Sequence, residues 1–502
     1  MFLYIHLPEM LKSKAIDVVK TFSDEELRDF ALFTRSPYFN TNKNIIKLFD
    51  RINTKAKLNS DDLTEEFLHE KIFPGKSYNY GIMKNLLSEL YKLIEKFLIV
   101  NSSKQNDDYR FEGLMSLARV YDDRFLDGNF KKLISGLKED LDNELIGFDR
   151  YHRYSLIEEN IYYFNANRSN NKDLQDAVYN EMIYTICEFF RKFSRNLWKI
   201  DINIGNLNTH YEKDFIEILG SNINFDGLTD ALDGIKKDDH DNIVMNTLLI
   251  KLLTEPDNVD SFFKLKKHLA KRIDDYTNYE RYSIITKVLS YCASAFRKGK
   301  REFVKESLDI KKLMMKKVRF KEDGLGPFNY IAFIETVRAF LHIGRTREAE
   351  NFLKNYSHTL ENDKRDVARK LSLAFIEEDK GNYDEAIALL ADIKPPDQDS
   401  KLLMKIVYLR AYFSAGYFEP AFSLINSTRI FINDSLRMDD NFKLNQLNTL
   451  KVFEKLMKIK SSPQNYSEFD INKIIEQVQN NFVLGATWFI SKANDLKSII
   501  KK

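Results

Sequence analysis

Apolar residues recur every three or four positions along most of the chain, which is the spacing of one face of an α-helix. Near the N-terminus Leu27, Phe30 and Phe33 follow this spacing. They come directly after Ser23 and Glu26, a pair that has the form of an N-terminal capping box. Similar amphipathic runs continue through the middle and the C-terminal part of the chain. The pattern predicts an all-α fold.

The first predicted helix ends at a proline-containing segment, RSPYFNTNKN, that spans residues 35–44. Pro37 disfavours the helical conformation of Ser36, so the chain should turn there before the next helix begins. The segment therefore predicts a corner between two helices. We expect Tyr38 and Phe39 to fill the gap between these helices, because aromatic side chains at helix junctions usually supply buried surface. The alternative is that the two aromatic residues recognise a ligand.

Polar stretches divide the chain into three predicted regions. NSSKQNDD interrupts the helical pattern near residue 105, and the pattern loosens between residues 202 and 241. A regular repeat begins at Gly299. We therefore predict an N-terminal helical module at 1–105, a middle helical region at 106–298 and a C-terminal helical array at 299–502.

Three segments of the C-terminal region share one pattern. HIGRTREAENFL, DKGNYDEAIALL and SAGYFEPAFSLI each carry a glycine, an alanine five residues later and a large aliphatic residue four positions further on. The spacing predicts helix-turn-helix repeats. In each repeat the glycine should take the left-handed conformation that ends the first helix, and the alanine should let the two helices approach closely. The glycines are Gly344, Gly381 and Gly416, and the alanines are Ala349, Ala386 and Ala421.

These segments resemble the tetratricopeptide repeat. DKGNYDEA matches that pattern best, with Leu373 and Ala374 in the first helix, Tyr383 after the turn and Leu390 in the second helix, although Lys370 stands where an aromatic residue is usual. The resemblance implies an α-solenoid in which stacked helix pairs form a curved superhelix. The helices after Phe431 are expected to cap the array. The segment FALFTRSPYFN and its surroundings resemble the start of a set of uncharacterised bacterial helical-repeat proteins.

The resemblance to the tetratricopeptide repeat implies a partner-binding groove lined by the first helix of each pair. The Lys, Asn and Arg set with which some members of that family hold a C-terminal carboxylate is missing, because Ile334, Ser372, Leu403 and Val407 stand at four of its places. We therefore expect a protein or peptide partner that binds through an internal segment or a helix. The groove candidates are Arg338, His342, Phe375, Glu378, Arg410 and Phe413.

Charge is nearly balanced, with 77 Lys and Arg against 75 Asp and Glu, so any polyanionic partner requires a local basic patch. Residues 297–321 carry eleven Lys or Arg against three acidic residues. On a helix, four of the basic residues would share one side and could neutralise phosphates. A nucleic-acid-associated regulator is therefore the alternative function, and a solvated outer face of the array is the simpler interpretation. The four residues are Lys305, Lys312, Lys316 and Arg319.

Sequence motifs for enzymes fail on inspection. The PGKS segment lacks the earlier glycine of a phosphate-binding loop, and His69 and Glu70 are followed by Phe73 where a zinc protease needs a second histidine. The DDHD segment at 238–241 could supply oxygen and imidazole ligands to a divalent metal, but acidic residues at a helix N-terminus are the simpler interpretation. We expect a non-enzymatic protein without a cofactor or a metal.

Glycine and proline are scarce, at 17 and 9 residues, which favours long helices. The two cysteines, Cys187 and Cys292, fall in apolar helical runs and should be buried thiols in a reducing compartment. The first residues lack the features of an export signal, and no apolar run reaches the length of a membrane-spanning helix. These features predict a cytoplasmic protein that does not enter the membrane.

Overall fold

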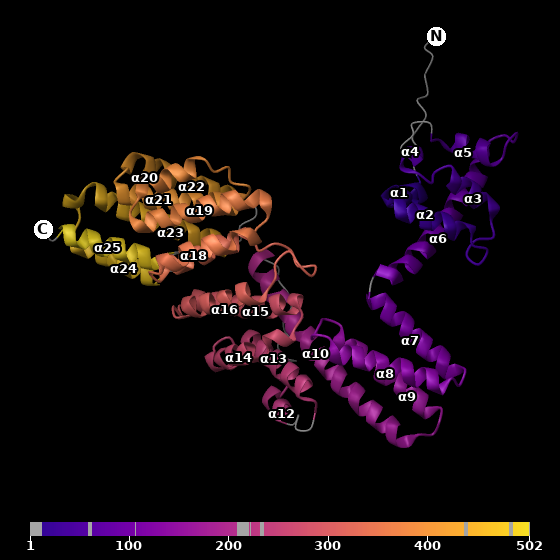
Figure 1. Cartoon of the computed structure of the whole chain (residues 1–502). Helices are drawn as coiled ribbons and strands as arrows, with labels where there is room; N and C mark the ends of the chain where they lie inside the picture. The colour runs from indigo at the N-terminus through magenta and orange to yellow at the C-terminus, as the bar shows by residue number, and fades with distance from the viewer. Residues whose placement is uncertain are drawn as a thin grey trace, which may run out of the picture. The chain divides into compact units, whose positions relative to one another are not determined.

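The computed structural model describes residues 13–58, 63–105, 107–207, 220, 222–230, 235–435, 440–480 and 485–500 (Figure 1). Within these ranges the secondary structure is helical, apart from one isolated bridge between Ile146 and Tyr276. The all-α prediction is confirmed. None of the helices described combines the length and the apolar character that crossing a membrane requires. Part of the predicted irregular segment at 202–241 lies outside the described residues.

The chain forms two compact units. The first comprises residues 1–138 and 160–170, and the second comprises residues 139–159 and 171–502. The three predicted regions stay a prediction, and the predicted boundary near residue 105 falls where one long helix ends. The first unit contains α1 (Lys14–Thr21), α2 (Asp24–Arg35), α3 (Lys43–Asp50), α4 (Lys55–Leu58), α5 (Glu65–Ile72), α6 (Tyr80–Gln105) and α7 (Asp107–Asp123), and α8 (Asp127–Asn143) and α9 (Arg150–Ala166) contribute to both units.

The core of the first unit is built around Phe30 of α2, which is fully buried. Its ring centroid lies 4.8 Å from that of Phe49 on α3 and 5.1 Å from that of Phe97 on α6. The predicted capping box at the start of α2 is present: the Ser23 amide donates to Glu26 at 2.8 Å and the Glu26 amide donates to Ser23 Oγ at 3.2 Å. The capped helix thereby places its aromatic face against α3 and α6.

The corner between α2 and α3 uses only one of its two aromatic residues. The Phe39 ring stacks on Phe33 at 4.1 Å between centroids, as expected, whereas Tyr38 is 87% exposed. The expectation that Tyr38 also fills the gap is therefore wrong. A buried asparagine completes the corner, since Asn40 Nδ2 donates to the Thr34 carbonyl at 2.7 Å. The amide satisfies a backbone oxygen that the end of α2 leaves without an intrahelical partner.

The second unit is a succession of packed helices. The helices α15 to α22 pack as consecutive pairs, and the first helices α17, α19 and α21 also pack on one another in order, which is compatible with a helical-repeat arrangement (Figure 1). The described helices are α10 (Asn171–Leu207), α12 (Phe225–Asp230), α13 (Lys237–Thr254), α14 (Val259–Arg272), α15 (Asn278–Arg297), α16 (Phe303–Lys317), α17 (Tyr330–His342), α18 (Thr346–Tyr356), α19 (Asn362–Lys380), α20 (Tyr383–Ala391), α21 (Gln398–Ala415), α22 (Phe418–Asp434), α23 (Asp440–Ser461), α24 (Glu468–Asn480) and α25 (Ala486–Ile500).

The repeat glycines and alanines behave as predicted. The φ angles of Gly344, Gly381 and Gly416 are +70°, +89° and +82°, so each glycine adopts the left-handed conformation directly after a first helix. The three alanines of the following helices are all 0% exposed. Side chains at the turns also connect successive pairs: Thr346 donates to Asp379 at 2.8 Å and Tyr417 donates to Asp384 at 2.9 Å. The local repeat pattern therefore determines both the turn and the close contact after it.

Replacement of the two corner aromatics should have unequal effects. We expect Phe39→Ala to lower the free energy of unfolding by about 2 to 3 kcal/mol, because it removes a partly buried ring that packs on the core. Tyr38→Ala should change it by less than about 0.5 kcal/mol, because that side chain is exposed. Urea denaturation of both variants measures the difference. Equal losses would show that Tyr38 is buried in solution.

The left-handed glycine of the second repeat provides another test. Gly381→Ala should destabilise the protein by about 1 to 2 kcal/mol, because an L-residue is strained at this positive φ even though the nearest atom to an added Cβ is 3.8 Å away. The control is Gly136→Ala on an exposed part of α8, where nothing lies within 4 Å and alanine should add about 0.5 to 1 kcal/mol of helix stability. Thermal melting of both variants should shift in opposite directions.

Candidate functional site

The six groove candidates lie on three consecutive first helices. Arg338 and His342 are on α17, Phe375 and Glu378 on α19, and Arg410 and Phe413 on α21. Contacts join the three helices: Arg338 Cζ lies 4.9 Å from the centroid of the Phe375 ring, and Arg410 Nη2 lies 2.7 Å from Glu378 Oε2. We call these six residues the inner-helix cluster.

The C-terminal helix α25 packs against the inner-helix cluster. Trp488 Nε1 donates to Glu378 Oε1 at 3.1 Å, and Thr487 Oγ1 lies 3.0 Å from His342 Nδ1. The indole also contacts Phe413, with 5.4 Å between ring centroids, and Arg410 Cζ lies 5.1 Å from it. Trp488 was not identified from the sequence as part of this surface, because nothing in the local pattern connects it to a helix 110 residues earlier.

Burial differs strongly within the cluster. Phe375 and Phe413 are 1% and 2% exposed, so in this conformation they support the surface from within. Glu378 is 4% exposed, whereas the side chains of Arg338 and Arg410 each keep 20% of their surface exposed. Because Arg410 already contacts Glu378 and Trp488, Arg338 and the partly buried His342 are the members through which a further molecule could be contacted.

Electrostatics follow from this burial. Burial raises the pKa of Glu378, and the nearby Arg410 guanidinium opposes that rise. Burial lowers the pKa of His342, and Arg301, Arg338 and Arg410 lower it further by repulsion, which favours a neutral imidazole. The cluster thus offers a buried carboxylate acceptor beside the Arg410 guanidinium. Such an arrangement can hold an aromatic side chain that carries an N–H donor.

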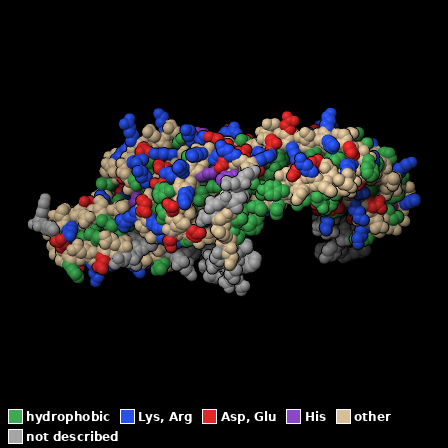
Figure 2. Space-filling view, turned by 90° about the horizontal axis from the view of Figure 1, so that it is seen from below, with side chains coloured by type: hydrophobic (Ala, Val, Ile, Leu, Met, Phe, Trp, Pro, Cys, Tyr) green, Lys and Arg blue, Asp and Glu red, His purple; other side chains and the backbone are tan. Residues whose placement is uncertain are grey.

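The basic side of α16 is present but largely balanced by acidic neighbours. Lys305, Lys312 and Lys316 of α16 are exposed; Arg319 is also exposed, but it lies beyond the end of α16 at Lys317, so the prediction that it shares a helix face with the three lysines is wrong. Lys312 Nζ lies 2.5 Å from Glu348 Oε2, and Arg319 Nη2 lies 2.9 Å from Asp323 Oδ2. Figure 2 shows basic and acidic side chains interspersed over the face that it displays. These pairs reduce the local positive potential that phosphate binding would need.

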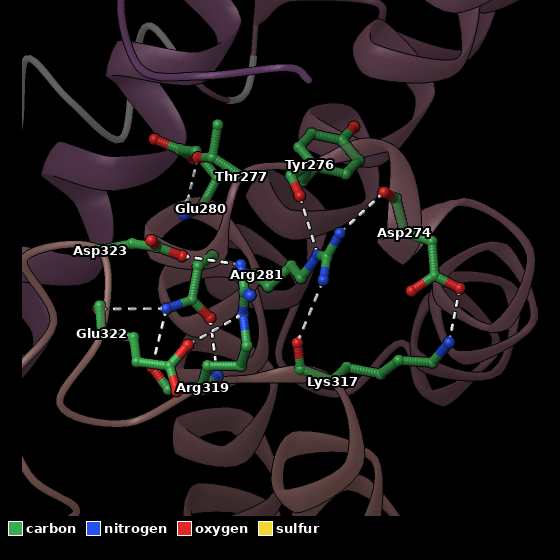
Figure 3. A network of polar contacts seen from close by, with 10 residues as sticks. Asp274, Tyr276, Thr277, Glu280, Arg281, Lys317, Arg319, Glu322 and Asp323 are labelled. Atoms are coloured by element: carbon green, nitrogen blue, oxygen red, sulfur yellow. Dashed lines mark hydrogen bonds and ion pairs between the residues drawn. The ribbon is translucent and has the colours of Figure 1, made fainter. Parts of the chain in front are cut away.

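The segment after α16 is held by the N-terminal part of α15 and the turn before it (Figure 3). Asn278 accepts from the Arg319 amide at 2.7 Å and donates to the Arg319 carbonyl at 2.8 Å. Arg281 donates to the carbonyls of Tyr276 and Asp274 at 2.8 and 2.9 Å. The backbone of Arg319, in the basic segment 297–321, is therefore held in place by hydrogen bonds with α15.

The acidic segment at 238–241 pairs with an arginine. Arg272 of α14 lies 2.5 Å from Asp238 and 3.0 Å from Asp241. Asp239 is buried, and burial raises its pKa to about 6. Over the described part of the chain no group of three or more His, Cys, Asp or Glu side chains is placed to hold a metal ion.

Both cysteines are buried, in agreement with the sequence pattern. Burial raises the pKa of each thiol, that of Cys292 to about 12. A thiol with such a pKa is almost entirely protonated at neutral pH and is a poor nucleophile. The two residues therefore act as small apolar side chains in the core.

Comparison with protein-family models, with curated protein sequences and with solved structures finds no match to this chain. The functional argument therefore depends on the geometry of the inner-helix cluster and on the arrangement of the helices that carry it.

Removal of the buried carboxylate tests this geometry. Glu378→Ala leaves the Arg410 guanidinium and the Trp488 N–H without their acceptor in a buried place, and we expect a loss of about 3 to 5 kcal/mol in the free energy of unfolding. The matched control is Glu350→Ala, which removes an exposed carboxylate 2.8 Å from Lys380 and should cost at most about 1 kcal/mol. Chemical denaturation distinguishes the two. A loss for Glu378→Ala no larger than that of the control would contradict the described contact.

Proposed function

We propose that the protein is a non-enzymatic interaction scaffold whose C-terminal array consists of tetratricopeptide-like repeats and binds a segment of a partner protein. The observation that carries this proposal is the seating of a helix on the inner-helix cluster. Trp488 is held there by a carboxylate, a guanidinium and a phenyl ring, which are contacts of the kind that helix recognition uses.

The repeat geometry supports the same proposal. The left-handed glycines Gly344, Gly381 and Gly416 follow α17, α19 and α21, and α19 packs on both α17 and α21, so side chains from three repeats come together. The partner segment would contact this surface beside α25, at Arg338 and His342, where the side chains are partly exposed. The mixture of cationic, acidic and aromatic groups suits a helix or an internal segment better than a free carboxylate.

A nucleic-acid-associated regulator is the second candidate, and the exposure of Lys305, Lys312, Lys316 and Arg319 is the observation in its favour. The pairing of Lys312 and Arg319 with acidic side chains favours the scaffold. The two candidates predict different co-purifying molecules, because a protein segment survives nuclease treatment and a nucleic acid does not.

Affinity purification of the tagged full chain, with and without nuclease and followed by mass spectrometry, tests the scaffold. We expect a small set of stoichiometric proteins that persist after nuclease treatment and that are lost at least tenfold in Arg338→Glu. The matched control is Lys354→Glu on the second helix α18, which makes the same change of charge at an exposed position and should retain the partners.

Nucleic acid that co-purifies and disappears in the double variant Lys312→Glu, Lys316→Glu would replace the scaffold by the second candidate. Proteins that persist equally in Arg338→Glu and Lys354→Glu would show that the partner binds elsewhere on the chain.

A further inference from the structure

A group of buried cations lies between α10 and α15, away from the inner-helix cluster. Two side-chain hydrogen bonds tie these helices together: Arg191 Nη1 donates to Glu280 Oε1 at 3.2 Å, and Trp198 Nε1 donates to Ser290 Oγ at 3.1 Å. Along α10, Arg195 falls between Arg191 and Trp198. Along α15, Lys287 falls between Glu280 and Ser290, so both cations lie between the two cross-links.

Arg191 and Lys287 are buried, Arg195 is partly exposed, and the carboxylates that act on this group, Glu280 and Asp149, are fewer than the three cations. Lys287 is 4% exposed, and in the described ranges no carboxylate lies within ion-pair distance of its Nζ atom. The Nε atoms of Arg191 and Arg195 are buried and have no hydrogen-bond partner there. Glu280 is paired with Arg191. Since an unpaired buried charge is unfavourable, an anion that binds at Arg195 and Lys287 would stabilise this arrangement.

The two guanidinium groups are held in place before any ligand arrives. The ring of Phe148 lies 4.6 Å from Arg191 Cζ and 4.2 Å from Arg195 Cζ, and Arg191 also donates to the Gly147 carbonyl at 2.9 Å. Burial lowers the pKa of Lys287 to about 8, and Arg191 and Arg195 lower it further by repulsion while Glu280 opposes them.

We propose that Arg195 and Lys287, with Arg191 beside them, form a binding site for the phosphate group of a small molecule. A planar guanidinium that presents several N–H donors and an ammonium point charge are the two side-chain types that bind phosphate best. Arg195 is partly exposed, so an anion could contact its guanidinium from solvent. A bound phosphate would supply the negative charge that the described residues do not. The site does not depend on the scaffold function.

The test is the melting temperature of the full chain in increasing inorganic phosphate, compared with sodium chloride at equal ionic strength. A ligand that binds only the folded state raises the melting temperature by an amount that grows with its concentration relative to its dissociation constant. We expect a phosphate-specific rise in the wild-type protein that is lost in Lys287→Met and in Arg195→Met. The matched control is Lys311→Met, which removes another lysine whose pKa is lowered by burial and which should keep the rise.

A second titration, with a sugar phosphate, distinguishes the two possible sources of the phosphate group, which are free phosphate and a phosphorylated metabolite. Half-saturation at a lower concentration than with inorganic phosphate would assign the site to a phosphorylated metabolite, and equal or weaker binding would assign it to free phosphate. The proposal is overturned if neither compound raises the wild-type melting temperature beyond the chloride control. It is also overturned if Lys287→Met and Arg195→Met keep the full rise. A Lys287→Met variant too unstable to measure leaves Arg195→Met to decide.

Discussion

Close approach of paired helices is the constraint on which the C-terminal array depends. Two helices can pack at short distance only where one of them presents a small side chain, and the alanines of the repeats are fully buried at such contacts. The turn before each alanine must also reverse the chain within a few residues, which the left-handed glycines allow. The repeats that carry Gly344, Gly381 and Gly416 have both the left-handed glycine and the buried alanine. Their first helices therefore lie next to one another, and side chains from these helices come into contact.

Pairing of charges organises much of the rest of the second unit. Arg272 lies near three carboxylates, two of them in the acidic segment at 238–241, and Lys266 contacts Glu306 and Asp309. Where cations in this unit have fewer carboxylate partners, the difference can indicate a binding site for an anion. Between α10 and α15 the three cations outnumber the carboxylates that act on them, Glu280 and Asp149, and an anion that binds there would add negative charge.

Local features of the fold could be predicted from the sequence because their causes are local. The capping box at Ser23 and the left-handed glycines each depend on a few consecutive residues, and the structure confirms them. The corner at Tyr38 and Phe39 was predicted only in part. Two adjacent aromatic residues have the same preference for burial, and which of them points inward is decided by the direction of the chain as it leaves α2, which no local pattern records.

The candidate site shows the same division between local and distant causes. Its first-helix residues follow from the repeat register, so six side chains could be named in advance. The contact with Trp488 joins segments far apart in the chain and has no periodic pattern, and neither has the grouping of Arg195 with Lys287.

The position of α25 has a consequence for recognition. Its Phe489, Ala493 and Leu496 are buried in the same core as Phe413 and Phe453, so the helix is an integral part of the array's end. Removal of α25 by a partner would expose that apolar core to water, which is strongly unfavourable. For the proposed scaffold, the surface open to a partner would be the part of the inner-helix cluster that α25 leaves exposed, together with α25 itself. A partner would then contact side chains of three repeats and of α25 at the same time.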